Sequence, residues 1–228
     1  MSIEVKKSSD LKANLRQTIL SIGDSRTGKT HFIGTMCEHE KVLVINAEDG
    51  LATIADKQFD AIKVNSFAQF KEALNWYMSV GHKDYTMLSI DSLNRVQSYL
   101  QYELDADGKL SQNQWGEVLA TMRKFIDVLS KQCPTSLHIT SMAMESKDEL
   151  TGQIRIYPNI QGSFKYDLTG YFDTVLFHTC APDKDGSTKY WCQIQGDSRV
   201  IAGSRHQALK GMKNIPADYG FIKSKVGG

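Results

Sequence analysis

One eight-residue stretch limits what this chain can fold into more than any other part of the sequence. It follows an apolar run at 18–22, leads into a helix-like segment, and reads Gly23-Asp24-Ser25-Arg26-Thr27-Gly28-Lys29-Thr30. This spacing of glycines, lysine and threonine is that of a P-loop. The glycines let backbone N–H groups surround phosphates, the lysine reaches the outer phosphates and the threonine hydroxyl is placed to bind Mg²⁺. A helix that begins here also directs the positive end of its dipole at the phosphates.

The motif predicts a set of nucleotide-binding residues. The alternative is a glycine turn beside a surface lysine, but the strand-like and helix-like sequence on either side disfavours it. We expect Thr30 to ligate Mg²⁺ as well as to bind the nucleotide. The full set of expected nucleotide-binding residues is Gly23, Asp24, Ser25, Arg26, Thr27, Gly28, Lys29, Thr30 and His31.

Composition is that of one domain without a strong net charge. The chain has 228 residues, of which 41% are hydrophobic, which is enough for a sizeable core in a single α/β domain. Its 27 Lys and Arg nearly balance its 26 Asp and Glu, so any contact with DNA must come from a local patch. We expect 1–16 to be an N-terminal arm and 17–228 to be a single domain.

Cysteine usage and hydropathy indicate a protein of the cytoplasm. The cysteines at 37, 133, 180 and 192 lack the spacing of a zinc site, and we expect them to be reduced, buried thiols. The N-terminus has no apolar core of signal-peptide length, and no run of about eighteen apolar residues occurs. The sequence therefore predicts no membrane partner.

Apolar segments predict strands and helices in the order of a mainly parallel sheet, because short continuous apolar runs are typical of buried parallel strands. Two late strands around a turn at 182–187 indicate an antiparallel finish. We interpret the polar stretch 94–113 as an insertion, and 144–162 as a long functional loop that could include a hairpin at 153–157. The expected strands are 42–45, 61–64, 85–90, 136–141, 174–178, 189–194 and 198–204, and the expected helices are 31–39, 67–80 and 115–131.

Two acidic residues follow expected strands and are candidates for chemistry. Asp91 ends the run 85–90, and Glu48 comes shortly after the run 42–45. Because ligands of a doubly wound sheet bind at the carboxyl ends of its strands, both acids should converge on the outer phosphate. Asp91 is placed to hold Mg²⁺ and Glu48 to polarise the attacking water. The alternatives are a helix cap for Asp91 and a solvated loop pair of Glu48 with Asp49.

Three further segments carry a resemblance to a known family. They are Ala47-Glu48, Ile90-Asp91-Ser92 and the late Ala202-Gly203-Ser204-Arg205. With them the chain resembles the RecA-type ATPase core, and especially the short phage-encoded nucleotide-binding proteins linked to single-strand annealing and recombination. The resemblance covers roughly residues 17–222. It implies a RecA-like α/β fold with a mainly parallel sheet, ATP and Mg²⁺ as cofactors, and a location in the host cytoplasm.

The resemblance also implies catalytic roles. It makes Glu48 the catalytic glutamate beside Lys29, and Arg205 a cationic finger that enters the ATP site of a neighbouring subunit. Gly203 stands where relatives often carry a second cation. After Glu48 the sequence has no aromatic residue placed to stack on adenine as in RecA.

The strand 136–141 ends where RecA carries a glutamine that senses the γ-phosphate. Here Thr140, Ser141 or Glu145 would have to substitute for it. The DNA-binding loops of RecA correspond to about 94–113 and 144–163 in this chain. Their candidate phosphate contacts are Arg155, Lys147, Lys109 and Lys165, although a solvated charged surface explains each of them about as well.

The leading hypothesis is a Mg²⁺-dependent ATPase that assembles head to tail, as a ring or filament, on single-stranded DNA and promotes pairing or annealing. A phage single-strand-binding protein is a further candidate partner. The main alternative is a nucleotide-dependent binding module or loader that acts as an accessory partner of a replication protein. A small-molecule kinase is disfavoured because no Arg-rich lid follows 115–131, and a GTPase because no Asn-Lys-x-Asp motif occurs.

Overall fold

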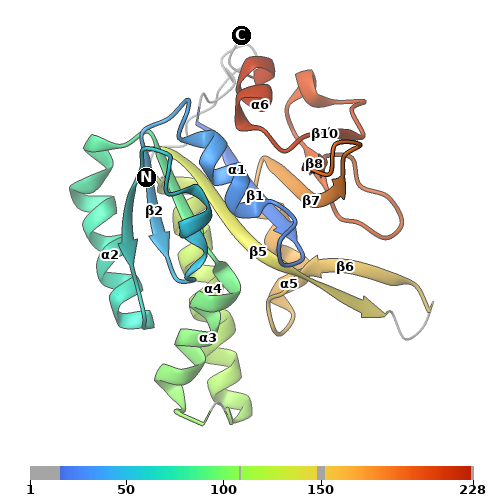
Figure 1. Ribbon diagram of the computed structural model, residues 1–228. Coiled ribbons are helices and arrows are strands. Elements are labelled where there is room, and N and C mark those ends of the chain that lie inside the picture. Colours follow the sequence, from blue (N-terminus) through green and yellow to red (C-terminus); the bar gives the residue numbers. More distant parts are fainter. Residues whose placement is uncertain (1–15, 108, 148–151, 227–228) are drawn as a thin grey trace, which may run out of the picture.

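The computed structural model of the protein describes residues 16–107, 109–147 and 152–226. Its centre is a sheet with the strand order β10-β8-β7-β1-β5-β4-β2-β3, to which β6 and β9 are attached through β5 and β7 (Figure 1). The strands are β1 (Thr18–Gly23), β2 (Val42–Asn46), β3 (Asp60–Lys63), β4 (Met87–Asp91), β5 (Ser136–Lys147), β6 (Ile154–Pro158), β7 (Thr174–Pro182), β8 (Thr188–Gln193), β9 (Gly203–Ser204) and β10 (Asn214–Pro216). The helices are α1 (Lys29–Met36), α2 (Phe67–Ser79), α3 (Leu93–Leu104), α4 (Gln112–Gln132), α5 (Phe164–Asp167) and α6 (Tyr219–Val226), with 3₁₀ turns η2 (Gly50–Ile54), η3 (Gly81–Asp84), η4 (Leu168–Tyr171) and η5 (Gln207–Leu209).

Most of the sheet is parallel. Strands β3, β2, β4, β5, β1 and β7 all run in one direction, whereas β8 and β10 continue the sheet antiparallel. The expected RecA-like α/β fold, with a mainly parallel sheet flanked by helices and antiparallel strands at its end, is confirmed.

Alternate side chains of the central strands bury a hydrophobic core on each face of the sheet. Leu20 and Ile22 of β1 belong to the core that is covered by α2, α3 and α4. Ile19 of the same strand belongs to the core under α1 and α6. Because successive strand residues point to opposite faces, a strand buried on both sides has the continuous apolar sequence that predicted it.

Local sequence sets where the helices begin. Ser66 caps α2, as its position predicts, and its hydroxyl accepts the N–H of Gln69. Ser111 and Gln114 form a reciprocal capping box at α4. Gly28, directly before α1, has a φ of 95°, a left-handed conformation that glycine adopts without steric cost. The chain can therefore turn sharply from β1 into α1.

Two polar stretches are more regular than their composition suggested. The prediction of an insertion at 94–113 is wrong. Most of this stretch forms α3, which buries Val96 and Leu100 in the core. The loop expected at 144–162 is wrong in its first part, since β5 continues to Lys147 and pairs antiparallel with β6. Of the hairpin expected at 153–157, this range forms one strand, and the end of β5 is its partner strand. Figure 1 shows this pair as a two-stranded ribbon that projects from the body of the protein, and we call it the β5–β6 ribbon.

Other details of the prediction also differ from the structure. The strand expected at 198–204 is reduced to β9. Cys180 is exposed, whereas Cys133 and Cys192 are buried as expected. Of the expected N-terminal arm, 1–15 lies outside the described residues. The guanidinium of Arg16 donates hydrogen bonds to the backbone carbonyls of Ser130 and Cys133, at the carboxyl end of α4. None of the described helices is long and apolar enough to cross a membrane.

Candidate functional site

A cavity of about 530 Å³ lies at the carboxyl ends of the central parallel strands. Six of the nine residues expected to bind a nucleotide line it: Ser25, Arg26, Gly28, Lys29, Thr30 and His31. The other residues that line the cavity are Glu48, Gly50, Thr53, Ile54, Asp91, Met142 and Tyr190. The two candidate acids therefore do converge on the P-loop, as the strand-end rule predicted.

Hydrogen bonds within the P-loop hold the side chains of Lys29 and Thr27 in place. Lys29 is buried, and its ammonium donates hydrogen bonds to the carbonyl oxygens of Gly23 (2.8 Å) and Asp24 (2.7 Å). Thr27 donates its hydroxyl to the carbonyl of Asp24 at 2.8 Å. Burial lowers the pKa of Lys29, while Asp91 and other carboxylates oppose this shift. The cation is held at the mouth of the loop, where outer phosphates would compete with the two carbonyls.

Asp91 ends β4 and is nearly completely buried, with 3% of its surface exposed. Its carboxylate accepts the hydroxyl of Thr140 from the adjacent β5 at 2.5 Å. Burial raises the pKa of Asp91 and the charge of Glu48 adds to this, whereas Thr140 and Lys29 act in the opposite direction. A nearby cation would therefore stabilise the ionised form of Asp91.

Glu48 is half-buried in the loop after β2, and two polar side chains hold its carboxylate. Ser92 donates its hydroxyl to Oε1, and the amide of Asn94 lies 3.5 Å from the same oxygen. Asn94 also accepts the backbone N–H of Met142 at 3.1 Å. The candidate base is thus linked through Asn94 to β5 at the point where this strand leaves the sheet for the β5–β6 ribbon.

The oxygen ligands in the cavity fit Mg²⁺ bound with a nucleotide. Thr30 offers a hydroxyl and Asp91 a carboxylate, which are ligands that Mg²⁺ prefers. Among the described residues, no group of three or more His, Cys, Asp or Glu could hold a metal by itself. A magnesium ion here would therefore take its other ligands from phosphate oxygens and water, as is usual in P-loop sites.

Of the three possible replacements for the γ-phosphate-sensing glutamine, Thr140 lies nearest the chemistry because it binds Asp91. Ser141 donates to the neighbouring carbonyl of Met142, and Glu145 forms an ion pair with Arg199 away from the cavity. Met142, the last residue of β5 that pairs with β1, lines the cavity.

Arg205 does not reach the P-loop of its own chain. It follows Ser204, which pairs with Thr174 at the amino end of β7, whereas the P-loop lies at the carboxyl end of the parallel neighbour β1. The guanidinium donates to the carbonyl of Gly170 (2.7 Å) and to the carboxylate of Asp173 (3.3 Å). Any role of Arg205 in hydrolysis would therefore be played in the site of another subunit.

The candidate DNA contacts are separated by the fold. Lys147 and Arg155 lie near the tip of the β5–β6 ribbon and are exposed. Lys165 lies at the base of the ribbon on α5, with its ammonium 5.1 Å from the ring of Tyr166. Lys109 lies instead in the turn between α3 and α4. The ribbon thus brings Lys147 and Arg155 close together, whereas Lys165 and Lys109 lie on other elements.

Sequence reasoning missed several residues of the site. Ser92 and Asn94 lie just after Asp91 in the sequence, so their proximity to a strand end could have identified them. Tyr190 gave no such signal, because it is one residue of an apolar strand far along the chain. Its ring packs over Gly28 and lies beside His31.

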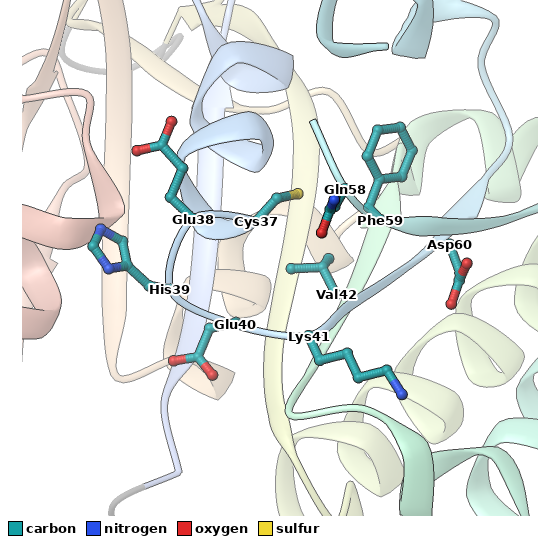
Figure 2. Close-up of a pocket in the computed structure, with 9 residues that line it drawn as sticks. All are labelled: Cys37, Glu38, His39, Glu40, Lys41, Val42, Gln58, Phe59 and Asp60. Atoms are coloured by element: carbon teal, nitrogen blue, oxygen red, sulfur yellow. The ribbon is translucent and has the colours of Figure 1, made fainter. Parts of the chain in front are cut away.

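A second hollow, of about 390 Å³, lies at the end of the sheet where the parallel strands begin, which we call its amino edge. It is formed by the turn after α1 and the segment that enters β3. Figure 2 shows the side chains that line it, among them Cys37, Glu38 and Glu40. Glu38 pairs with Lys57 at 2.6 Å. Burial raises the pKa of Cys37 to about 11, so this thiol is protonated at neutral pH and is a weak nucleophile.

Comparison with known proteins places this geometry in a wider context. A family model described as an AAA domain matches residues 15–206. Among solved structures, a prototypical ATPase from the type III secretion system of pathogenic bacteria aligns with 71% of this chain, at 13% sequence identity and a TM-score of 0.47. This chain spans 51% of the length of that ATPase. No curated protein matches the sequence.

Proposed function

The chain belongs to the AAA domain family of P-loop ATPases, and on that premise we propose that it is a Mg²⁺-dependent ATPase that assembles on single-stranded DNA and promotes homologous pairing or strand annealing in phage DNA recombination. The observation that carries the proposal is the continuity of β5. This strand binds Asp91 through Thr140, lines the nucleotide cavity with Met142, and continues into the β5–β6 ribbon with its exposed cations.

Four residues of the cavity have a defined part in the proposed hydrolysis: Lys29, Thr30, Asp91 and Glu48. Lys29 would neutralise charge on the outer phosphates, and Thr30 and Asp91 would hold the Mg²⁺, which would supply further charge stabilisation when bound. Glu48 orients the attacking water and accepts its proton, with Ser92 and Asn94 fixing the direction of the carboxylate. The burial of Asp91 and Lys29 strengthens these interactions, because water screens them less.

The β5–β6 ribbon is the proposed DNA-binding element. Lys147 and Arg155 supply phosphate contacts, and the half-exposed ring of Tyr166, next to Lys165, supplies a surface on which a base can stack. The nearly balanced charge of the whole chain supports such a local patch over a diffuse attraction. Movement of β5 on DNA binding would reach Glu48 through Met142 and Asn94.

Head-to-tail assembly is proposed because Arg205 lies far from the P-loop of its own chain. In a ring or filament built from heterologous contacts, one face of each subunit meets a different face of the next. Arg205 would then enter the neighbour's site and neutralise charge that develops on the transferred phosphoryl group. Its partner Asp173 holds it at the surface until then.

Turnover of ATP with and without single-stranded DNA tests the proposed function. We expect hydrolysis to depend on Mg²⁺ and to rise with single-stranded DNA, and DNA binding to weaken as salt rises because phosphate contacts release counterions. Replacing Lys147 and Arg155 together by alanine should remove the stimulation and flatten the salt dependence. The matched control is the pair Lys83→Ala and Lys184→Ala, which lies outside the ribbon.

Two results would contradict the proposal in different ways. Nucleotide binding without measurable hydrolysis under any of these conditions would favour a binding module or loader. Hydrolysis that DNA does not change would leave an ATPase whose partner is not DNA. For the assembly, a mixture of Arg205→Ala and Lys29→Ala subunits should recover activity that neither variant has alone. If the two co-assemble by light scattering and stay inactive, Arg205 is not a finger in trans.

A further inference from the structure

Two rings meet at one end of the nucleotide cavity. Tyr190 on β8 and His31 in the first turn of α1 have ring centroids 4.8 Å apart and planes inclined by 30°. Both line the same cavity as the P-loop, and among the described residues that line it they are the two with aromatic side chains. Two aromatic rings in contact with each other thus line the same cavity as the polar residues Lys29, Glu48 and Asp91.

The fold holds Tyr190 firmly at this place. Tyr190 pairs with Cys180 of β7 in the antiparallel hairpin. The backbone carbonyl of Tyr190 also accepts the N–H of Ala217 at 3.1 Å. The ring lies directly over the P-loop, since a Cβ atom added to Gly28 would be 2.5 Å from Cδ1 of Tyr190. The side chain is only half-buried, so part of the ring remains open to a ligand.

The P-loop fixes which end of the cavity receives which part of a nucleotide. Lys29 lies with Glu48 and Asp91, whose charges act on it directly, so the outer phosphates belong there. His31 follows Thr30 in the first turn of α1, and its ring contacts that of Tyr190 in the same cavity. A nucleotide whose outer phosphates meet Lys29 can therefore extend its nucleoside past Thr30 toward His31 and Tyr190.

We propose that Tyr190, together with His31, forms the platform on which the nucleobase stacks. The inference rests on the proposed function, because it takes the ligand to be a nucleoside triphosphate, and it adds the base subsite. Desolvation lowers the pKa of His31 below its ordinary value, so that the imidazole is uncharged at neutral pH and presents a neutral ring. Stacking uses the face of a base, so purines, with their larger face, should bind more tightly than pyrimidines.

Calorimetric titration with two ligands tests the platform. Mg²⁺-ATP contains the base, whereas Mg²⁺-tripolyphosphate offers only the phosphates. In Tyr190→Ala the dissociation constant for ATP should rise by roughly 5- to 150-fold, the usual cost of losing one base-stacking ring, while that for tripolyphosphate stays within about twofold. Tyr190→Leu fills the space over Gly28 without an aromatic face and should show the same split, and Tyr190→Phe should resemble the wild type.

Tyr102→Ala is the matched control, because Tyr102 is an exposed tyrosine on α3 and its loss should change neither titration. The difference in affinity between ATP and CTP should also shrink in Tyr190→Ala. Equal weakening of both ligands would show that the ring only supports the P-loop, and an unchanged affinity for ATP would show that the base lies elsewhere. Either result overturns the platform. If the wild type binds neither ligand, the proposed function itself is wrong.

Discussion

The cavity at the carboxyl edge of the sheet and the hollow at its amino edge differ less in volume, about 530 Å³ against 390 Å³, than in how their charges are arranged. At the carboxyl edge Lys29, Asp91 and Glu48 converge, and within the described part of the chain Lys29 donates hydrogen bonds only to backbone carbonyls and the sulfur of Met142. At the amino edge the acids have cationic partners, such as Glu38 with Lys57 and Glu40 with Lys223.

This comparison shows what distinguishes a binding site from a simple hollow. In a binding site, charged groups converge without being neutralised by one another, so that a ligand can pair with them. Parallel strands bring their carboxyl ends, with the loops that follow them, to one edge, so polar residues from distant parts of the chain meet there. The amino edge receives the ends of helices and short turns, whose charged side chains neutralise one another at the surface. Variants at matched positions of the two edges should therefore differ sharply in effect.

The largest difference is expected between two glutamates. Glu48→Gln keeps the shape of the side chain but removes the base, so ATP hydrolysis should fall by roughly 100- to 10,000-fold while ATP binding survives. Glu38→Gln makes the same change at the amino edge and should leave hydrolysis as it is. Steady-state turnover and calorimetric titration of both variants check this. Undiminished hydrolysis in Glu48→Gln would remove its assignment as the base.

Two lysines give the next comparison. Lys29→Ala removes the buried cation from the phosphate site and should weaken ATP binding by about 2 to 5 kcal/mol, or roughly 30- to 5,000-fold. Lys57→Ala breaks only exposed ion pairs, with Glu38 and Asp56, and should leave the affinity unchanged. Fluorescent-nucleotide titration measures both. Similar affinities for the two variants would mean that the phosphates are not bound at the P-loop.

Acid should destabilise the buried centre of the sheet and its amino edge at different pH. Under α1, His138 and His178 each lie 2.9 Å from the hydroxyl of Ser21 and are completely buried. Burial lowers the pKa of His138 from 6.5 to about 3. The neutral ring therefore contributes stability that is complete above pH 6.5 and is lost as the pH falls toward 3. At pH 4.5 the loss should be about 2 to 3 kcal/mol for this histidine.

The amino edge should respond only at lower pH. Burial would raise the pKa of Glu40, but hydrogen bonds from Lys223, Thr86 and Tyr219 outweigh it, and the pKa is lowered from 4.5. Its contribution is therefore present above pH 4.5 and lost below that value. Urea unfolding between pH 7.5 and 4.5 should show a decline that His138→Gln makes shallower and Glu40→Gln does not. An equally steep decline in His138→Gln would exclude this histidine as the cause.

The smallest effect is expected from the residues that orient Glu48. Ser92→Ala removes one hydrogen bond to a carboxylate, worth about 1.5 to 3 kcal/mol when both partners are held in place. Because Asn94 remains beside the same oxygen, we expect only the lower end of this range, a fall in kcat of roughly tenfold with KM unchanged. Ser98→Ala on α3, whose hydroxyl donates only to a backbone carbonyl, is the control. A change in KM without a change in kcat would contradict the positioning role.

The sequence by itself determined the P-loop, the positions of the central strands along the chain and the convergence of Glu48 and Asp91. These depend on local patterns: a glycine spacing that only a tight phosphate loop uses, apolar runs that mark buried strands, and the rule that parallel strands present their carboxyl ends together. The cap at Ser66 belongs to the same class, since a cap needs only its own first turn.

Tertiary structure alone decided the rest. The helix α3 has a polar outer face, and only the core that receives Val96 and Leu100 makes its amphipathic pattern stable. The length of β5 depends on its pairing with β6. Tyr190 reaches Gly28 and His31 because β8 returns antiparallel to β7 and so comes back to the carboxyl edge. Contacts of this kind join residues about 160 positions apart. Local sequence does not predict them, because the free energy of packing depends on surfaces that meet only after the sheet has formed.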